Sequence, residues 1–312
     1  MARHLNLFFV GRARMLSMTA NFSPGCQAPG CRAAARRSFR VNGLTLRALE
    51  WGAPGRPGLC FLHGGSAHAH WFDAVAPAFA DRYHVLSLDQ RGHGESDWPP
   101  PSTDGPAYAT ENFVSDLLGV MEALGWKEMT LCGHSMGGHN AMAFAAWHPD
   151  RVRALVVVDS RPAIPPDRLD RMHRRGHRGP RRHDTLEAAL ASFRLLPPES
   201  SADPALLDHL AREGIVRREG HYLYRFDPGC NGMRRPVDAW LLLHRITAPT
   251  LLVRGEHSPV LPRAMAQEMA ARIVRARWEE IPGAYHHLVL DRPATFTAAL
   301  DLFLREADGF SP

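Results

Sequence analysis

The chain has 312 residues, of which 45% are hydrophobic and 22% are charged, values typical of a globular protein that buries a substantial core. No run of 18 apolar residues is present, which excludes a transmembrane helix from the predicted elements. The net charge of +5 is concentrated in two basic stretches, residues 1–49 and 168–183. We interpret the second as an exposed loop, and we find no recognition fold that would indicate nucleic-acid binding.

The five cysteines do not form a recognisable framework. Their number is odd, and Cys60 and Cys132 fall in predicted buried strands, where cysteine behaves as a small hydrophobic residue. Cys26 and Cys31 lack a second pair of ligands. We therefore expect no disulfide and no metal site, and a protein of the reducing cytoplasm.

Residues 1–38 are rich in arginine and contain no Asp or Glu. We interpret them as an N-terminal extension, either disordered or spurious, with a targeting segment and a later start at Met15 or Met18 as open alternatives. Regular structure is predicted from residue 39, where 39–51 indicates a β-hairpin with its turn at Asn42-Gly43.

From there, short apolar runs alternate with amphipathic segments. The predicted strands after the hairpin are 58–62, 84–88, 129–132, 154–159, 250–254 and 277–281, and the predicted helices between them are 73–80, 110–124, 139–148, 262–271 and 293–305. Alternating strands and helices predict an α/β fold with a mostly parallel, doubly wound sheet.

The alternation stops between Asp159 and Thr250, where the chain is rich in Pro, Arg and Glu and has helical stretches at 185–195 and 204–212. We interpret residues 161–246 as a helical lid inserted into a core made of residues 39–160 and 247–308.

The most informative motif is Gly133-His-Ser-Met-Gly137, which follows a predicted strand and precedes a predicted helix. This is G-x-S-x-G in the strand–turn–helix context of a nucleophile elbow. Ser135 is the candidate nucleophile, and it needs a base, an acid and an oxyanion hole.

Two of these parts are indicated by position. The turn His63-Gly64-Gly65 follows an early strand, so the backbone N–H groups of Gly65 and Met136 are the candidate oxyanion donors. The base is expected after the last strand, because the order in such folds is Ser, acid, His. His286 is the candidate base, with His287 as the alternative.

These residues together resemble the lidded α/β-hydrolases. The resemblance rests on His63-Gly64-Gly65, on Asp89 through Ser96, on the elbow at 133–137, on Arg254-Gly-Glu256 and on Gly283 through Pro293, and it covers about residues 39–305. It implies an α/β-hydrolase fold and a structural rather than chemical role for Arg91 and His93.

The position of the acidic residue that should assist the base departs from the family pattern. Relatives commonly carry Asp three residues after the glycine that matches Gly255, but Ser258 stands there and cannot supply a charge. Asp159, at the end of the strand that follows the elbow unit, is the preferred acid, and Glu256 is the alternative. Tyr285 also replaces a glycine that many relatives have.

Several residues near the oxyanion turn and the elbow are candidates for the substrate cavity. They are His63, Gly64, His68, His70, Trp71 and His134.

The sequence therefore predicts a serine hydrolase that cleaves a carboxylic ester of a small or medium substrate, without a metal or organic cofactor. C–C bond hydrolysis of ring-cleavage dienones, thioester or lactone hydrolysis, and a non-catalytic binding role remain as alternatives. The expected partner is a small acyl substrate, with no nucleic acid and no membrane span, and the sequence does not indicate the oligomeric state.

Overall fold

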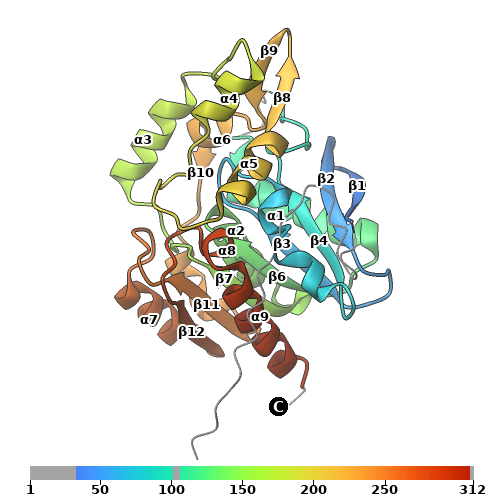
Figure 1. Ribbon diagram of the computed structural model, residues 1–312. Coiled ribbons are helices and arrows are strands. Elements are labelled where there is room, and N and C mark those ends of the chain that lie inside the picture. The colour runs from blue at the N-terminus through green and yellow to red at the C-terminus, as the bar shows by residue number, and fades with distance from the viewer. Residues whose placement is uncertain (1–32, 101–105, 310–312) are drawn as a thin grey trace, which may run out of the picture.

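The computed structural model describes residues 33–100 and 106–309 (Figure 1). Most of the predicted extension therefore lies outside the described residues. Its last residues do not, because strand β1 begins at Ala35 rather than at residue 39. Ala35–Ser38 pair with Arg47–Glu50 of β2, and this backbone pairing extends the hairpin although the four side chains are exposed.

An eight-stranded sheet forms the centre of the molecule, in the order β1-β2-β4-β3-β6-β7-β11-β12. The pairs β1–β2 and β2–β4 are antiparallel and all the others are parallel. The predicted α/β class with a mostly parallel, doubly wound sheet is confirmed. The strands are β1 Ala35–Val41, β2 Leu44–Trp51, β3 Gly58–Leu62, β4 His84–Asp89, β6 Met129–His134, β7 Val152–Val158, β11 Thr250–Gly255 and β12 Ala276–Ile281.

Helices cover both faces of this sheet. One core packs under α1 (Thr110–Leu124), α2 (Met136–Trp147) and α7 (Arg263–Arg272), and the other under α8 (Leu288–Asp291), α9 (Pro293–Ala307) and the short 3₁₀ turns η1 and η2. Residues of β3 alternate between them, since Cys60 and Leu62 belong to the first core whereas Leu59 and Phe61 belong to the second. This period of two explains why its continuous apolar sequence is buried on both sides.

The predicted helix at 73–80 is wrong. Two 3₁₀ turns, η1 Ala69–Phe72 and η2 Ala76–Phe79, stand in its place. Pro77 has no N–H to donate and restricts the residue before it, so an α-helix cannot continue through this segment.

The 91 residues 159–249 separate β7 from β11, although these strands are neighbours in the sheet. The inserted segment stacks at one end of the sheet (Figure 1). Its elements are α3 Pro166–Gly176, α4 Leu186–Ser192, α5 Pro204–Glu213, β8 Ile215–Arg218, β9 His221–Tyr224, α6 Gly229–Gly232, β10 Arg234–Arg235, which pairs with β5 Tyr108–Ala109, and the 3₁₀ turns η4 Ala239–Leu241 and η5 Leu243–Arg245; a further turn, η3 Pro149–Arg151, precedes β7.

The predicted helices at 185–195 and 204–212 correspond to α4 and α5, but the first part of the basic run, residues 168–176, is helical, and only 177–183 lie outside a helix. Residues 166–176 form α3, with Pro166 at the first helical position and an ion pair between Asp167 and Arg171 one turn apart. Within the described ranges, no helix combines the length and apolar character needed to cross a bilayer.

Candidate active site

Ser135 stands at the junction between β6 and α2. Its backbone has φ 51° and ψ −115°, a conformation that residues with a side chain rarely adopt. Two hydrogen bonds hold this strained corner, because the Ser135 N–H donates to the Val158 carbonyl at 2.9 Å and the Ser160 hydroxyl donates to the Ser135 carbonyl at 2.6 Å. The neighbouring strand β7 therefore fixes the serine that the motif predicted as a nucleophile.

The two motif glycines allow the strand and the helix to approach this closely. A Cβ at Gly133 would lie 2.4 Å from the Gly137 carbonyl oxygen, and a Cβ at Gly137 would lie 2.1 Å from the Leu62 carbonyl oxygen. Both distances are shorter than any real contact, so only glycine fits at these positions.

His286 reaches Ser135 from the loop between β12 and α8. Its Nε2 lies 3.1 Å from Ser135 Oγ, and its backbone carbonyl accepts a hydrogen bond from His134 Nε2 at 3.0 Å. The ring is buried, and burial lowers the pKa of His286 well below its usual value. At neutral pH the imidazole is therefore uncharged and can accept the serine proton. The alternative, His287, is turned away from Ser135, and its Nε2 donates to the Pro197 carbonyl at 3.0 Å.

Asp159 completes a chain of three side chains. Its Oδ2 lies 2.6 Å from His286 Nδ1, and its side chain is fully buried at the end of β7. Burial raises the pKa of the Asp159 carboxyl to about 7, while hydrogen bonds from Ser258 and from the Gly255 N–H oppose that rise. The arrangement fixes the His286 ring with Nδ1–H toward the acid and Nε2 toward the serine.

Glu256, the alternative acid, has no such contact. Its side chain is 43% exposed, and it accepts a hydrogen bond from the Gly283 N–H at 2.8 Å. Glu256 follows directly after the last residue of β11, and at that position its side chain turns outward rather than toward the imidazole. The carboxylate at His286 is thus that of Asp159.

Ser258, which occupies the position where relatives carry the acid, faces the same carboxylate. Its hydroxyl donates to Asp159 Oδ2 at 2.5 Å and accepts the N–H groups of Val260 and Leu261. Because β7 and β11 are neighbours, the loop after β11 reaches the carboxylate at the end of β7. Sequence reasoning missed this role, although the substitution at the usual acid position was a signal for it.

We expect Ser258→Ala to shift the acidic limb of the kcat/KM profile to higher pH. The hydroxyl stabilises the ionised carboxylate, so its loss raises the pKa of Asp159, and the required ionised form then disappears at a higher pH as the solution is acidified. A hydrogen bond to a charged group is worth about 1.5–3 kcal/mol, which corresponds to about 1–2 pH units. Rates measured from pH 5 to 9 on wild type and variant check this; an equal rate loss at every pH would contradict it.

The candidate oxyanion hole lies beside the serine. A Cβ at Gly64 would lie 3.3 Å from Ser135 Cβ, so the turn after β3 packs directly on the elbow. In the described part of the chain, neither the Gly65 nor the Met136 N–H donates to another protein group. Both are free for an oxyanion.

Buried polar contacts hold this turn in place. Ser66 N–H donates to His93 Nε2 at 3.1 Å, and the Gln90 side chain donates to the His63 carbonyl at 2.8 Å. His63 itself bonds the Gly64 carbonyl and the Gln90 N–H. His63, predicted as a cavity residue, thus has both ring nitrogens engaged with the turn.

The other predicted cavity residues divide into two groups. His134 and Trp71 pack near the site, with His134 4.8 Å from the His286 ring and Trp71 6.3 Å from the His287 ring. His68 and His70 face the inserted segment instead, since His68 Nε2 donates to the Leu210 carbonyl at 3.0 Å and His70 contacts Asp73 and Glu213.

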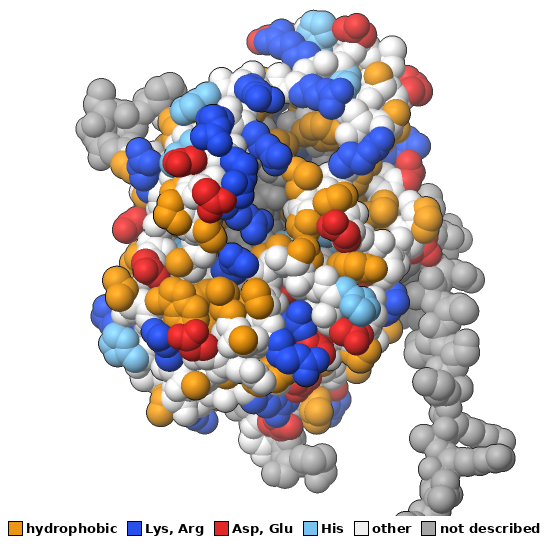
Figure 2. All heavy atoms as spheres, turned by 90° about the vertical axis from the view of Figure 1, so that its left-hand side faces the viewer, with side chains coloured by type: hydrophobic (Ala, Val, Ile, Leu, Met, Phe, Trp, Pro, Cys, Tyr) orange, Lys and Arg blue, Asp and Glu red, His pale blue; other side chains and the backbone are white. Residues whose placement is uncertain are grey.

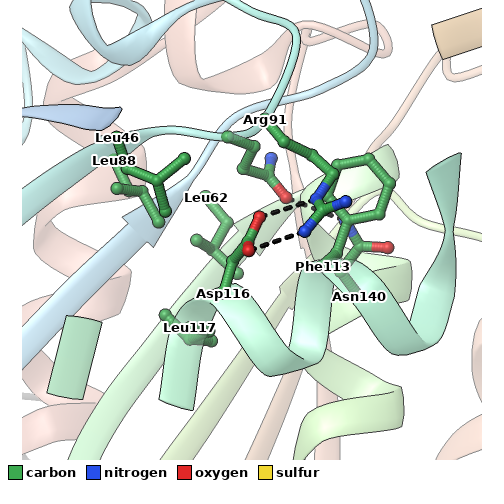
Figure 3. Close-up of a pocket in the computed structure, with 9 residues that line it drawn as sticks. Leu46, Leu62, Leu88, Arg91, Phe113, Asp116, Leu117 and Asn140 are labelled. Atoms are coloured by element: carbon green, nitrogen blue, oxygen red, sulfur yellow. Dashed lines mark hydrogen bonds and ion pairs between the residues drawn. The ribbon is translucent and has the colours of Figure 1, made fainter. Parts of the chain in front are cut away.

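A small cavity of about 10 Å³, whose lining includes Gln90 and Asn140, has room for one water at most (Figure 3). Arg91 and Asp116 form a two-pronged ion pair on its wall, with both N–O distances 2.7 Å. This buried pair agrees with the structural role expected of Arg91. The cavity is too small for a substrate.

Two side-chain groups in the described residues have the spacing of metal ligands, namely His134, His286 and His287, and His70, Asp73 and His209. In the second group, one oxygen of Asp73 already accepts from both histidines at 2.8 Å. In the first, both ring nitrogens of His286 are engaged with Ser135 and Asp159. Hydrogen bonds within the protein therefore account for the second group and for His286 of the first, whereas Nδ1 of His134 and Nδ1 of His287 have no hydrogen-bond partner among the described residues.

The sheet, the elbow and the hydrogen-bonded series Ser135–His286–Asp159 define a class of protein, the α/β-hydrolases. The chain belongs to this family, because the model of the alpha/beta hydrolase fold matches residues 57–293.

Particular relatives are similar over nearly their whole length. The chain is 26% identical over 282 residues to 2-(acetamidomethylene)succinate hydrolase of Mesorhizobium japonicum, covering 86% of this chain and 94% of that protein. It is 31% identical over 268 residues to a putative 2-succinyl-6-hydroxy-2,4-cyclohexadiene-1-carboxylate synthase of Bacillus subtilis, covering 84% and 96%.

Among solved structures, E-2-(acetamidomethylene)succinate hydrolase superposes with a TM-score of 0.75 at 25% identity, covering 87% of this chain and 99% of the other. The chain is thus similar to hydrolases of the α/β fold, whose substrates differ widely.

Proposed function

We propose that the protein is a serine hydrolase that cleaves a carboxylic ester of a small or medium substrate. The observation that carries this proposal is the continuous contact from Ser135 Oγ through the His286 ring to Asp159, at 3.1 and 2.6 Å. These three side chains come from three separate loops of the fold, and their order along the chain is Ser, acid, His, as nucleophile-elbow enzymes require.

In the proposed cycle, His286 removes the proton from Ser135 Oγ as the oxygen attacks the acyl carbonyl. The Gly65 and Met136 N–H groups receive the negative charge of the tetrahedral intermediate. His286 then protonates the leaving alcohol, and water activated by the same imidazole releases the acid from the acyl-enzyme. Asp159 stabilises the imidazolium in both steps.

We also propose that the inserted segment acts as a lid, as the sequence predicted for residues 161–246. Its contacts with the site support this, since the Pro197 carbonyl accepts from His287 and the Leu210 carbonyl accepts from His68.

The same groups suit other acyl substrates. Thioester and lactone hydrolysis use the same cycle. C–C and amide bond cleavage remain alternatives, because the two relatives are named as a succinate hydrolase and a cyclohexadiene-carboxylate synthase. The non-catalytic alternative was motivated by Ser258, and the contact between Asp159 and His286 removes that motivation.

Hydrolysis of 4-nitrophenyl acetate, butyrate and octanoate tests the proposal. We expect turnover of the short esters and a burst of about one nitrophenolate per enzyme when deacylation is slow. Failure on all three esters, together with turnover of a ring-cleavage dienone, would favour the C–C hydrolase instead.

A further inference from the structure

Arg234 is a buried cation that has no partner of opposite charge in the described part of the chain. Its side chain is only 2% exposed, and one nitrogen, Nη2, donates to Asn140 Oδ1 at 3.2 Å. The other two, Nε and Nη1, have no hydrogen-bond partner within the described residues. No salt bridge of the described chain includes this residue, and its guanidinium lies over the Phe113 ring at 5.1 Å.

The same protein shows how a buried arginine is ordinarily accommodated. Arg91 also lies over the Phe113 ring, 6.0 Å from its centroid, and Asp116 meets it with two hydrogen bonds (Figure 3). A charge that has left water usually has such a partner, because the desolvation of an unpaired buried charge is unfavourable. Burial lowers the pKa of Arg234 to about 10, so at neutral pH the group still carries its charge. Among the described residues, no acidic side chain supplies its counter-charge, so Arg234 is able to receive an anionic group of a ligand.

The position of Arg234 links it to the candidate active site. Its partner Asn140 is five residues beyond Ser135, on α2, which corresponds to about 7.5 Å along the helix axis. Asn140 in turn donates to Gln90 Oε1 at 2.8 Å, and Gln90 holds the His63 carbonyl of the oxyanion turn. The guanidinium is thus connected to the turn that carries Gly65.

The inserted segment supplies Arg234 and a second cation near the site. The Arg234 carbonyl accepts a hydrogen bond from His173 of α3 at 2.9 Å, which fixes β10 against that helix. Arg168, also on α3, is partly buried and forms no side-chain hydrogen bond or ion pair with the described residues, and its charge contributes to the lowered pKa of His286. On the face that includes α3 and α7 the surface is hollowed, and Lys or Arg side chains gather along one side of the hollow (Figure 2).

We propose that Arg234 binds a carboxylate carried by the substrate, so that the preferred substrate is a half-ester with one anionic end. This inference rests on the proposed function for its kinetic consequences but not for the binding of the anion. The unpaired Nε–H and Nη1–H groups donate to the carboxylate. An uncharged analogue would leave the buried guanidinium unpaired, so the enzyme should discriminate strongly against it.

Matched substrates test the kinetic consequence. In the first pair, mono-4-nitrophenyl succinate carries its charge in the acyl half and is compared with its neutral methyl ester. In the second pair, 4-acetoxybenzoate carries its charge in the leaving half and is compared with the neutral phenyl acetate. In at least one pair, we expect wild type to favour the anion, and Arg234→Gln to reduce that preference in kcat/KM by about 100-fold. Arg235→Gln is the matched control, because Arg235 is the exposed neighbour in the same strand and should keep the preference.

A binding measurement separates this inference from the proposed function. In the Ser135→Ala background, succinate should raise Tm, dimethyl succinate should not, and the shift should vanish in the double variant with Arg234→Gln. These results support the anion site even if no ester is hydrolysed. An equal Tm shift with and without Arg234, or an unchanged kinetic preference in both substrate pairs, would overturn the inference.

The stability of a second variant excludes a purely structural role. Removing an unpaired buried charge relieves its desolvation cost, so Arg234→Met without ligand should melt at or above the wild-type Tm. A marked fall in Tm would assign Arg234 to the core and would contradict its role as a ligand-binding residue.

Discussion

Replacing Ser135 with Ala is expected to lower kcat on 4-nitrophenyl acetate by about 10⁶-fold. The hydroxyl is the only protein group in the proposed cycle that forms a bond to the acyl carbon, so no acyl-enzyme can form without it. Removal of the serine from a comparable Ser-His-Asp constellation has an effect of that order, and what remains comes from the oxyanion hole and substrate binding. Initial rates at saturating ester measure the loss.

The control is Ser115→Ala, which removes an exposed serine hydroxyl from α1. It should keep the wild-type rate. Far-ultraviolet circular dichroism of both variants should match wild type, because neither position contributes side-chain volume to the core. A Ser135→Ala enzyme with more than about one hundredth of wild-type activity would show that another group carries the chemistry.

Asp159→Asn is expected to lower kcat by about 10⁴-fold while leaving the fold intact. An amide next to His286 Nδ1 cannot stabilise the imidazolium, and its N–H₂ group favours the imidazole tautomer with the proton on the wrong nitrogen. Ser258, which now donates to the carboxylate at 2.5 Å, finds an amide oxygen of the same size in the variant. Initial rates over pH 6–9 measure the effect.

Glu256→Gln provides the matched control, because it makes the same chemical change in the carboxylate that the sequence left as an alternative. Glu256 is exposed and bonds the Gly283 backbone, so we expect a change of less than about threefold. If Glu256→Gln caused the large loss and Asp159→Asn the small one, the acid would have to be reassigned.

The sequence was most informative where a local motif carries its own geometry. Gly133 and Gly137 predicted the elbow because no side chain fits between β6, α2 and β3 at those positions. His286 was predictable because the base of such a fold lies in the loop after the last strand, and that loop reaches the nucleophile. The sequence favoured Asp159 as the acid but left Glu256 as an alternative, because the choice depends on which strand ends are neighbours and on how each side chain turns there.

Other features were hidden for physical reasons. The sequence pattern of α3 is almost entirely polar, so no apolar face marked it as a helix. The segment 73–80 has an apolar pattern, but Pro77 divides it. Arg234 has no sequence signature, because a buried arginine and an exposed arginine look the same in a sequence. Its burial follows only from the packing of β10 between α2 and the rest of the inserted segment.

The central claim is that His286 makes Ser135 reactive, and covalent labelling tests it most directly. Incubation of the folded protein with a fluorophosphonate, followed by digestion and mass spectrometry, should place a single adduct on the peptide that contains Ser135, and the adduct should be lost in His286→Ala. A folded wild-type protein that leaves Ser135 unmodified, or a variant that labels as fast as wild type, would contradict the account.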